Sequence, residues 1–238
     1  MKPSILAFLL YSFAIALVPA KAYSADFSGL NIMTEDFPPF NYKQDGKAAG
    51  KAVDLLIKAS QAAGAPITRE KIDVITWARG YKMAQEGPNA MLFSMTRTEA
   101  REDLFKWAGP IAQNRVVVWA KKSSNIGQIA DMSKSTEKVG VVRDTVGDQL
   151  VVGAGVADNM IIRNSKPDSM AQMLINGRVK LWAYSETSGA QTLVEAGENI
   201  DDYEVVNVLK SKDLYFAFSK DVDDSVIELL QKGIDMAK

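Results

Sequence analysis

Two hydroxyls and a guanidinium stand close together in the middle of this chain. Ser94 and Thr96 alternate at the end of an apolar run, so both hydroxyls can point to one side of a predicted strand. Thr98 can cap the following segment and leave free backbone N–H groups at its start. Arg101 lies one turn further on and can reach back as a planar fork. Together these donors predict a carboxylate receptor; the alternative is a surface arginine paired with an acid such as Glu99.

A stiff aromatic loop comes earlier in the chain. Phe37 and Phe40 flank two prolines, which fix the backbone, and Glu35 and Asp36 lie directly before them. Flat apolar faces beside polar groups suit the capture of a small molecule. The alternative is an ordinary proline-rich turn with Phe40 in the core.

The amino-acid composition excludes several kinds of chemistry. The 238 residues contain no cysteine and no histidine. Disulfides, thiol catalysis, a lipidated cysteine, a Ser-His-Asp triad and zinc hydrolysis through histidine are therefore excluded. We expect no catalytic residue, no metal site and no cofactor, and an enzyme is not the favoured interpretation. The formal net charge of −1 gives no electrostatic case for a nucleic-acid partner.

The first residues of the chain have the pattern of an export signal. Lys2 precedes an apolar run over 5–18, and small residues such as Ala22 and Ala25 follow. The run is shorter than the ~20 residues of a resident membrane helix. We predict a cleaved signal peptide over 1–24 and an exported product. The alternative is an N-terminal anchor that stays uncleaved.

Hydrophobic periodicity divides the rest of the chain into alternating strands and helices. Strands are predicted at 30–33, 72–75, 90–94, 115–120, 139–142, 160–162, 179–184 and 214–218. Helices are predicted around 53–63, 77–85, 147–152, 168–175, 188–196 and 222–230, with Asp168 as a cap and Gly64 and Gly177 as stops. The alternation indicates an α/β fold with mainly parallel sheets.

Two polar segments beside extended runs interrupt this alternation, near Lys121–Lys122 and Lys210–Asp213. We interpret both as crossings between two lobes, with the C-terminal helix returning to the first. Lobe 1 then comprises 25–119 and 214–238, and lobe 2 comprises 120–213. Ligands of such lobes lie at the carboxyl ends of the strands, so we expect the binding site in a cleft between the lobes.

Four segments together give the chain a family resemblance. They are the signal peptide, the loop 35–41, the stretch 94–111 with its Thr98-Glu99-x-Arg101 element, and Lys138–Val142. In these segments the sequence resembles the bacterial extracellular solute-binding proteins of family 3, typified by polar amino-acid receptors of ABC importers. The resemblance implies a two-lobed periplasmic-binding-protein type II fold, two hinge strands, a periplasmic location and lobes that close on a ligand.

The resemblance also implies roles for particular residues. Arg101 matches the arginine that grips the ligand α-carboxylate, and Phe37 matches the aromatic residue that packs over the ligand. Ser94 and Thr96 match the hydroxyl positions. The loop after the first strand of the second lobe supplies further carboxylate donors in this family, and here that loop reads Arg143-Asp144-Thr145.

One half of the amino-acid site departs from the family pattern. Thr34 and Ser185 stand where the family places an acid that pairs with the ligand ammonium. Glu35 and Glu186 are each one residue away, and alternation along a strand turns such neighbours to opposite sides. The sequence leaves open whether either acid takes over this role. Glu35 and Ser185 are kept as candidate ligand contacts.

Aromatic side chains supply the remaining candidates. Trp77 and Arg79 open a predicted helix, where a Trp face and a second guanidinium can replace the amine site through cation–π or anion contacts. The alternative places Trp77 in the core and Arg79 in solvent. On the late strand, Trp182 is predicted to be core, while Tyr184 is open between core and cleft.

The resemblance implies a monomeric receptor for a small, polar, carboxylate-bearing solute, with the membrane permease of an ABC importer as its partner. Two alternatives stay open. One is a dehydratase-like enzyme on the same fold, with Glu35 or Glu186 as the proton shuttle. The other is a sensory module that presents a ligand to a membrane receptor kinase.

Overall fold

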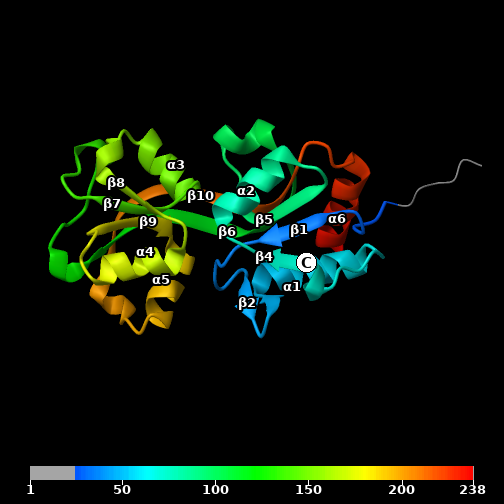
Figure 1. Cartoon of the computed structure of the whole chain (residues 1–238), viewed down its shortest axis with the longest axis horizontal. Coiled ribbons are helices and arrows are strands. Elements are labelled where there is room, and N and C mark those ends of the chain that lie inside the picture. The colour runs from blue at the N-terminus through cyan, green and yellow to red at the C-terminus, as the bar shows by residue number, and fades with distance from the viewer. Residues whose placement is uncertain (1–24, 238) are drawn as a thin grey trace, which may run out of the picture.

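A computed structural model describes residues 25–237, and the expected signal peptide at 1–24 lies outside them. One eight-stranded sheet runs through the molecule in the order β4-β1-β5-β10-β6-β9-β7-β8. Figure 1 shows its two ends in two lobes, each covered by helices. The predicted α/β class with two lobes is confirmed.

Each lobe contains a block of three parallel strands. In the first lobe, β1 (Asn31–Thr34) lies between β4 (Ile72–Val74) and β5 (Ala90–Thr96). In the second lobe, β7 (Val139–Val142) lies between β8 (Ile161–Asn164) and β9 (Leu181–Ser185). All residues of β5, β7 and β9 are buried. Unbroken burial is expected of strands that helices cover on both faces.

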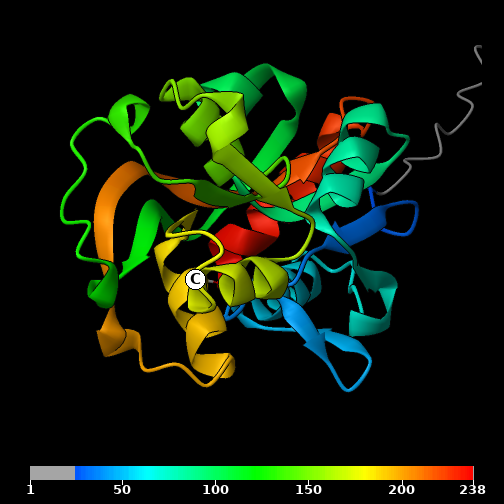
Figure 2. The same cartoon turned by 60° about the vertical axis from the view of Figure 1, so that its left-hand side comes forward.

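Two long strands connect the lobes. β6 (Lys106–Lys121) and β10 (Tyr203–Phe218) each have 16 residues and pair in antiparallel orientation. Figure 2 shows β10 running from its orange end in the second lobe to its red-orange end in the first. The sequence indicated only the apolar ends of these strands, at 115–120 and 214–218. β6 begins to pair with β9 at Val116, ahead of the expected crossing at Lys121–Lys122.

Three helices accompany each block of strands. The first lobe has α1 (Lys51–Ala62), α2 (Trp77–Glu86) and α6 (Asp224–Ala237). The second lobe has α3 (Val146–Gly153), α4 (Pro167–Ile175) and α5 (Glu186–Glu195). Short 3₁₀ turns occupy Arg69–Lys71, Glu99–Leu104, Lys122–Ser124, Met132–Lys134, Asp158–Met160 and Ile200–Asp202. No helix within 25–237 combines the length and apolar character that a membrane crossing requires.

The C-terminal helix α6 packs against α1 of the first lobe. α6 approaches α1 so closely at Gly233 that a Cβ there would lie 2.1 Å from the Ala59 carbonyl oxygen. One local prediction needs correction. Lys166, and not Asp168, is the residue that precedes α4, and Asp168 lies in its first turn. The turn at Asp45 joins a small hairpin of β2 (Tyr42–Gln44) and β3 (Lys47–Ala49), which the sequence analysis had not predicted.

Candidate functional site

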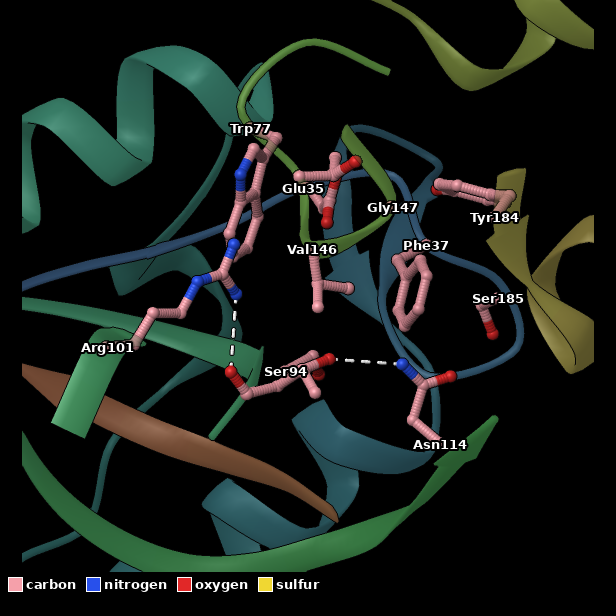
Figure 3. A pocket seen from close by; sticks show the side chains of 12 residues that line it. Glu35, Phe37, Trp77, Ser94, Arg101, Asn114, Val146, Gly147, Tyr184 and Ser185 are labelled. Atoms are coloured by element: carbon pink, nitrogen blue, oxygen red, sulfur yellow. Dashed lines mark hydrogen bonds between the residues drawn. The ribbon is translucent and has the colours of Figure 1, made fainter. Parts of the chain in front are cut away.

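A cavity of about 330 Å³ lies where the two lobes meet, at the carboxyl ends of their strands. The first lobe contributes the loop after β1, the start of α2, the end of β5 and the 3₁₀ turn at 99–104. The second lobe contributes the start of α3 and the end of β9. The lining residues are Glu35, Phe37, Trp77, Ser94, Thr96, Arg101, Asn114, Thr145, Val146, Gly147, Tyr184 and Ser185. Figure 3 shows their side chains converging from both lobes.

The lobes are closed against each other in this structure. Side chains of the first lobe donate hydrogen bonds to the second, from Trp77 Nε1 to the Asp144 carbonyl at 2.8 Å and from Arg101 Nε to Gln149 Oε1 at 3.1 Å. Parting of the lobes would break both of these hydrogen bonds.

Arg101 is the buried cation of the cavity. Its side chain comes from the 3₁₀ turn Glu99–Leu104 and the residue is 1% exposed. Arg69, Arg97, Arg115 and Arg163 form ion pairs with carboxylates, and Arg101 is not among them. Burial lowers the pKa of Arg101 to about 10, so the guanidinium is still charged at neutral pH. The site therefore holds a buried positive charge that is not paired with a carboxylate of the described chain.

Neutral acceptors hold the Arg101 guanidinium in place. Nη1 donates to the Thr96 carbonyl at 3.3 Å, Nη2 to the Asp144 carbonyl at 3.4 Å and Nε to Gln149 Oε1 at 3.1 Å. Two of these three acceptors belong to the second lobe. Because each terminal nitrogen carries two N–H groups, one N–H on each is left to donate elsewhere. A side-by-side pair of this kind matches the two oxygens of a carboxylate.

Two aromatic rings lie beneath this guanidinium. The Arg101 Cζ is 5.4 Å from the ring centroid of Trp77 and 5.1 Å from that of Tyr81. The two rings stack on each other at 5.7 Å. Cation–π contacts of this length favour the charged form. Trp77 thus lines the cavity and also belongs to a buried apolar cluster of the first lobe with Tyr81, Leu92 and Phe105, so the alternative that placed it in the core describes its packing correctly.

Glu35 is the acidic residue among the cavity-lining side chains. It is 5% exposed, and burial followed by repulsion from Asp36 raises its pKa to about 8, while Arg101 acts in the opposite direction. At neutral pH the carboxyl is mostly protonated and can donate a hydrogen bond. Strand alternation predicts that Glu35, one residue after Thr34, turns away from the site. β1 ends at Thr34, so alternation no longer sets the direction of the next residue.

Glu186, the second acidic candidate, is paired with a cation outside the cavity. Glu186 forms an ion pair with Arg115 at 2.6 Å and does not line the cavity. Its neighbour Ser185 does line it, and the Ser185 Oγ accepts the backbone N–H of Ser188 at the start of α5. Of the two acids, Glu35 is the one that a ligand in the cavity can reach.

Aromatic residues from both lobes close one side of the cavity. Phe37 meets Tyr184 edge to face with ring centroids 5.7 Å apart, and Tyr184 stacks on Trp182 at 4.9 Å. Trp182 is fully buried, as predicted. The Tyr184 hydroxyl, the Ser94 hydroxyl and the Asn114 Oδ1 are buried without a hydrogen-bond partner in the described residues. Buried polar groups of native proteins are normally satisfied, so these atoms are candidates for contacts with a bound solute.

The structure does not bring all predicted residues together. Arg79 and Arg143 are exposed and neither lines the cavity. The Asp144 side chain is exposed as well, and this residue meets Arg101 through its backbone carbonyl. Thr145 lines the cavity and caps α3 by accepting the N–H of Asp148. Within 25–237 no group of acidic side chains is arranged to hold a metal ion.

Three lining residues escaped the sequence analysis, Asn114, Val146 and Gly147. Asn114 donates to the Thr96 hydroxyl at 3.1 Å from the middle of β6, a strand that the sequence showed only in part. Gly147 lets α3 approach β9, because a Cβ there would lie 2.6 Å from the Ala183 carbonyl oxygen. The glycine directly after Thr145 was a signal that could have been used.

Solved structures share this fold. The arginine-, lysine-, histidine-binding protein ArtJ from Geobacillus stearothermophilus aligns with a TM-score of 0.74 and 20% identity, covering 87% of this chain and 88% of that one. A histidine-bound ABC uptake transporter substrate-binding protein from Streptococcus pneumoniae aligns with a TM-score of 0.74 and 18% identity, covering 86% and 85%. A histidine kinase sensor domain with similarity to periplasmic binding proteins aligns with a TM-score of 0.75 and 15% identity, covering 87% and 90%.

Sequence comparison gives the family. No curated protein matches the chain. The family model described as bacterial extracellular solute-binding proteins, family 3, matches residues 30–238, which include every residue that lines the cavity. This chain belongs to the bacterial extracellular solute-binding proteins of family 3.

Proposed function

We propose that this protein is an exported receptor that captures a small, polar, carboxylate-bearing solute between its lobes and delivers it to the permease of an ABC importer. The observation that carries the proposal is Arg101. A buried guanidinium costs several kcal/mol to desolvate unless a partner compensates it. Its acceptors within the described chain are neutral, at 3.1 to 3.4 Å. A ligand carboxylate supplies the missing negative charge.

The carboxylate would bind end-on to Arg101. The two free terminal N–H groups donate to its two oxygens, and the hydroxyls of Ser94 and Thr96 lie on the same lobe beside them. The Phe37 and Tyr184 rings pack against the apolar part of the solute. The second lobe reaches the ligand only when the lobes close, so binding shifts an open–closed equilibrium towards the closed form.

An amino-acid-like ligand would place its ammonium near Glu35. Glu35 is the acid of the cavity lining, and a positive charge beside it favours the ionised carboxylate. Such a ligand would release the Glu35 proton as it binds. Binding of an amino acid would therefore tighten as the pH rises towards the pKa of Glu35, about 8. An acid without an amino group would lack this dependence.

An observation supports a second candidate for the membrane protein that receives the ligand-loaded receptor. The similarity to a histidine kinase sensor domain favours, as a second candidate, a module that presents the ligand to a membrane receptor kinase. Both candidates predict the same cavity chemistry. Purified membranes that contain the ABC permease should retain the ligand-loaded protein if the first proposal holds. Binding to the ectodomain of a receptor kinase, without binding to such membranes, would favour the second.

A third candidate rests on Glu35 alone. A buried carboxyl with a pKa of about 8 can act as a proton shuttle, which is what a dehydratase-like enzyme on this fold would need. Incubation with small cyclic and linear carboxylic acids, followed by mass analysis, separates binding from turnover. A ligand recovered unchanged supports the receptor.

Native mass spectrometry of the protein purified from its own host is the direct test of the proposed function. We expect a co-purified small molecule that contains a carboxyl group, released by denaturation and absent from an Arg101→Met variant. A co-purified cation without a carboxyl group, or equal retention by the variant, would refute the proposal.

A further inference from the structure

One backbone carbonyl of the second lobe accepts hydrogen bonds from two side chains of the first. The Trp77 Nε1 donates to the Asp144 carbonyl at 2.8 Å, and the Arg101 Nη2 donates to the same oxygen at 3.4 Å. Trp77 is the first residue of α2, and Asp144 lies in the turn between β7 and α3. The contact crosses the cleft and involves no side-chain atom of Asp144.

The backbone conformation of Asp144 directs this carbonyl oxygen towards Trp77 and Arg101. Its φ is 60°, in the left-handed region that L-residues other than glycine seldom adopt. Asp is among the residues that tolerate this region best, because its short polar side chain can hydrogen-bond locally. A left-handed residue in a turn needs surrounding contacts that hold it.

Asp148 provides such a contact. The backbone N–H of Asp144 donates to Asp148 Oδ2 at 3.0 Å, so the first turn of α3 folds back over the turn that precedes it. Asp148 is 5% exposed although it is an acid. A buried carboxylate of this kind requires a cation and hydrogen bonds.

Arg163 from β8 supplies the cation. Its Nε lies 2.9 Å from Asp148 Oδ1 and 3.1 Å from Oδ2, and its Nη1 donates to Asp158 Oδ1 at 2.7 Å. Arg163 does not line the cavity. The pair therefore touches no ligand, yet it fixes the orientation of Asp148 and, through it, of the Asp144 turn.

We propose that Asp148 and Arg163 are positioning residues that hold the Asp144 carbonyl as an inter-lobe clasp for Trp77 and Arg101. The clasp joins atoms of the protein on both lobes, so it stabilises the closed form by itself and gives that form a population before a ligand binds. Its significance for capture rests on the proposed function, but the lobe closure itself does not. Asp144 belongs to the loop that was predicted to supply carboxylate donors, and in this proposal its main-chain carbonyl serves the contact between the lobes.

Because the chain contains no cysteine, spin labels attach only at cysteines that are introduced for the test. Spin labels on Lys58→Cys in α1 and Val194→Cys in α5, both exposed, report the distance between the lobes by pulsed electron paramagnetic resonance. The measurement uses the purified protein without any added solute. We expect a closed component in the distance distribution of the doubly labelled parent protein. A distribution with no closed component would overturn the proposal.

Two substitutions should reduce this closed component relative to the open one by about fivefold, the effect of losing one hydrogen bond. Trp77→Phe removes the indole donor and keeps an aromatic ring under Arg101. Asp148→Asn keeps the shape and removes the charge that Arg163 binds. Asp158→Asn is the matched control, because Asp158 also pairs with Arg163 but its side chain is 85% exposed. An unchanged distribution in Trp77→Phe, with native circular dichroism, would overturn the clasp.

A second pair of variants separates the main chain of Asp144 from its side chain. Asp144→Gly keeps the carbonyl and favours a positive φ, so its closed component should be at least as large as that of the parent. Asp144→Val disfavours the left-handed conformation and should lose the closed component. If Asp144→Gly lost the closed component, the contact between the lobes would depend on the Asp144 side chain, and the proposal would be refuted. All these readings stand even if no ligand is ever found, so a failure here is distinct from a failure of the proposed function.

Discussion

Phe37 and Tyr184 meet edge to face across the cleft, with their ring centroids 5.7 Å apart. One ring comes from the loop after β1 in the first lobe and the other from β9 in the second. Phe37 also stacks on Phe40 at 5.6 Å, which fixes its orientation. The pair therefore forms a wall of the cavity only when the lobes are closed.

Removing the Tyr184 hydroxyl should separate binding from stability. The hydroxyl is buried without a partner in the described residues, and burial raises its pKa well above the ordinary value. Tyr184→Phe keeps the ring, so the free energy of unfolding should stay unchanged or rise by up to about 1 kcal/mol. If the hydroxyl meets the solute, affinity for the co-purified ligand falls. Chemical denaturation and calorimetry measure the two quantities, and a marked loss of stability would contradict the contact geometry.

Arg101→Met should abolish capture without unfolding the protein. Losing one partner of a buried charge pair costs about 2 kcal/mol or more, which is a ~30-fold loss of affinity. Stability should not collapse, because the variant removes a buried charge that the described chain leaves without a carboxylate. Calorimetry with the co-purified solute gives the affinity, and thermal unfolding gives the stability.

Arg97→Met is the matched control for that experiment. Arg97 lies four positions earlier, pairs with Glu102 and packs over Trp107 and Tyr215 outside the cavity. Its affinity should match that of the parent. An Arg101 variant that binds as tightly as the Arg97 variant would remove Arg101 from the site.

Glu35→Gln should stabilise the protein at alkaline pH and not at acid pH. Below the ordinary pKa of 4.5 the Glu35 carboxyl is protonated in both the folded and the unfolded state. Between 4.5 and about 8 only the unfolded state loses the proton, so stability falls as the pH rises and stays reduced above that window. The glutamine variant lacks this loss. Its free energy of unfolding should exceed that of the parent by about 1.4 kcal/mol or more at about pH 9, the equivalent of one pKa unit.

Denaturation at about pH 4 is the internal control for Glu35, since parent and variant should then differ little. A variant whose advantage is the same at both pH values would show that Glu35 does not titrate in this range.

Gly233→Ala should destabilise the first lobe. The added Cβ would lie 2.1 Å from the Ala59 carbonyl oxygen, so α6 must move away from α1. Overpacking of this kind costs ~1–3 kcal/mol. Gly153→Ala in α3 is the control, because a Cβ there meets nothing within 4 Å. Equal unfolding midpoints for the two variants would contradict the close packing of α1 and α6.

The apolar strands and amphipathic helices were predictable because local sequence determines them. The strand at Val139–Val142 and the helix at Trp77–Glu86 are close to their predicted bounds. The first half of β6 was not predictable from hydrophobicity, since it contains Gly109-Pro110 and a polar stretch up to Arg115. Pairing with β10 along its whole length forms that half.

For the site, the sequence indicated which residues lie at strand ends. It could not show which residues of the other lobe lie opposite them. Ser94, Thr96 and Arg101 were grouped correctly in one wall of the cavity because they are close in sequence. Arg79 was a candidate because it follows Trp77 at a helix start, and Arg143 because of its place in the loop after β7, but their exposure depends on helix and turn orientation that the sequence does not specify. Asn114 lines the cavity because β6 pairs with β10, so no local sequence pattern could predict its place there.

The long strands also determine how the lobes can part. Between the last contact with β5 at Leu214 and the first contact with β9 at Val116, the segment Gln113–Arg115 pairs only with Ser211–Asp213 in the described sheet. Beyond this pairing, the ribbon is tied to the first lobe by the hydrogen bonds Asn114–Thr96 and Arg97–Asp213, and to the second lobe by the ion pair Arg115–Glu186. Asn114 sits in that ribbon and lines the cavity. Bending of the ribbon would therefore displace Asn114 and change the shape of the cavity, so a relative movement of the lobes is coupled directly to the geometry of the site.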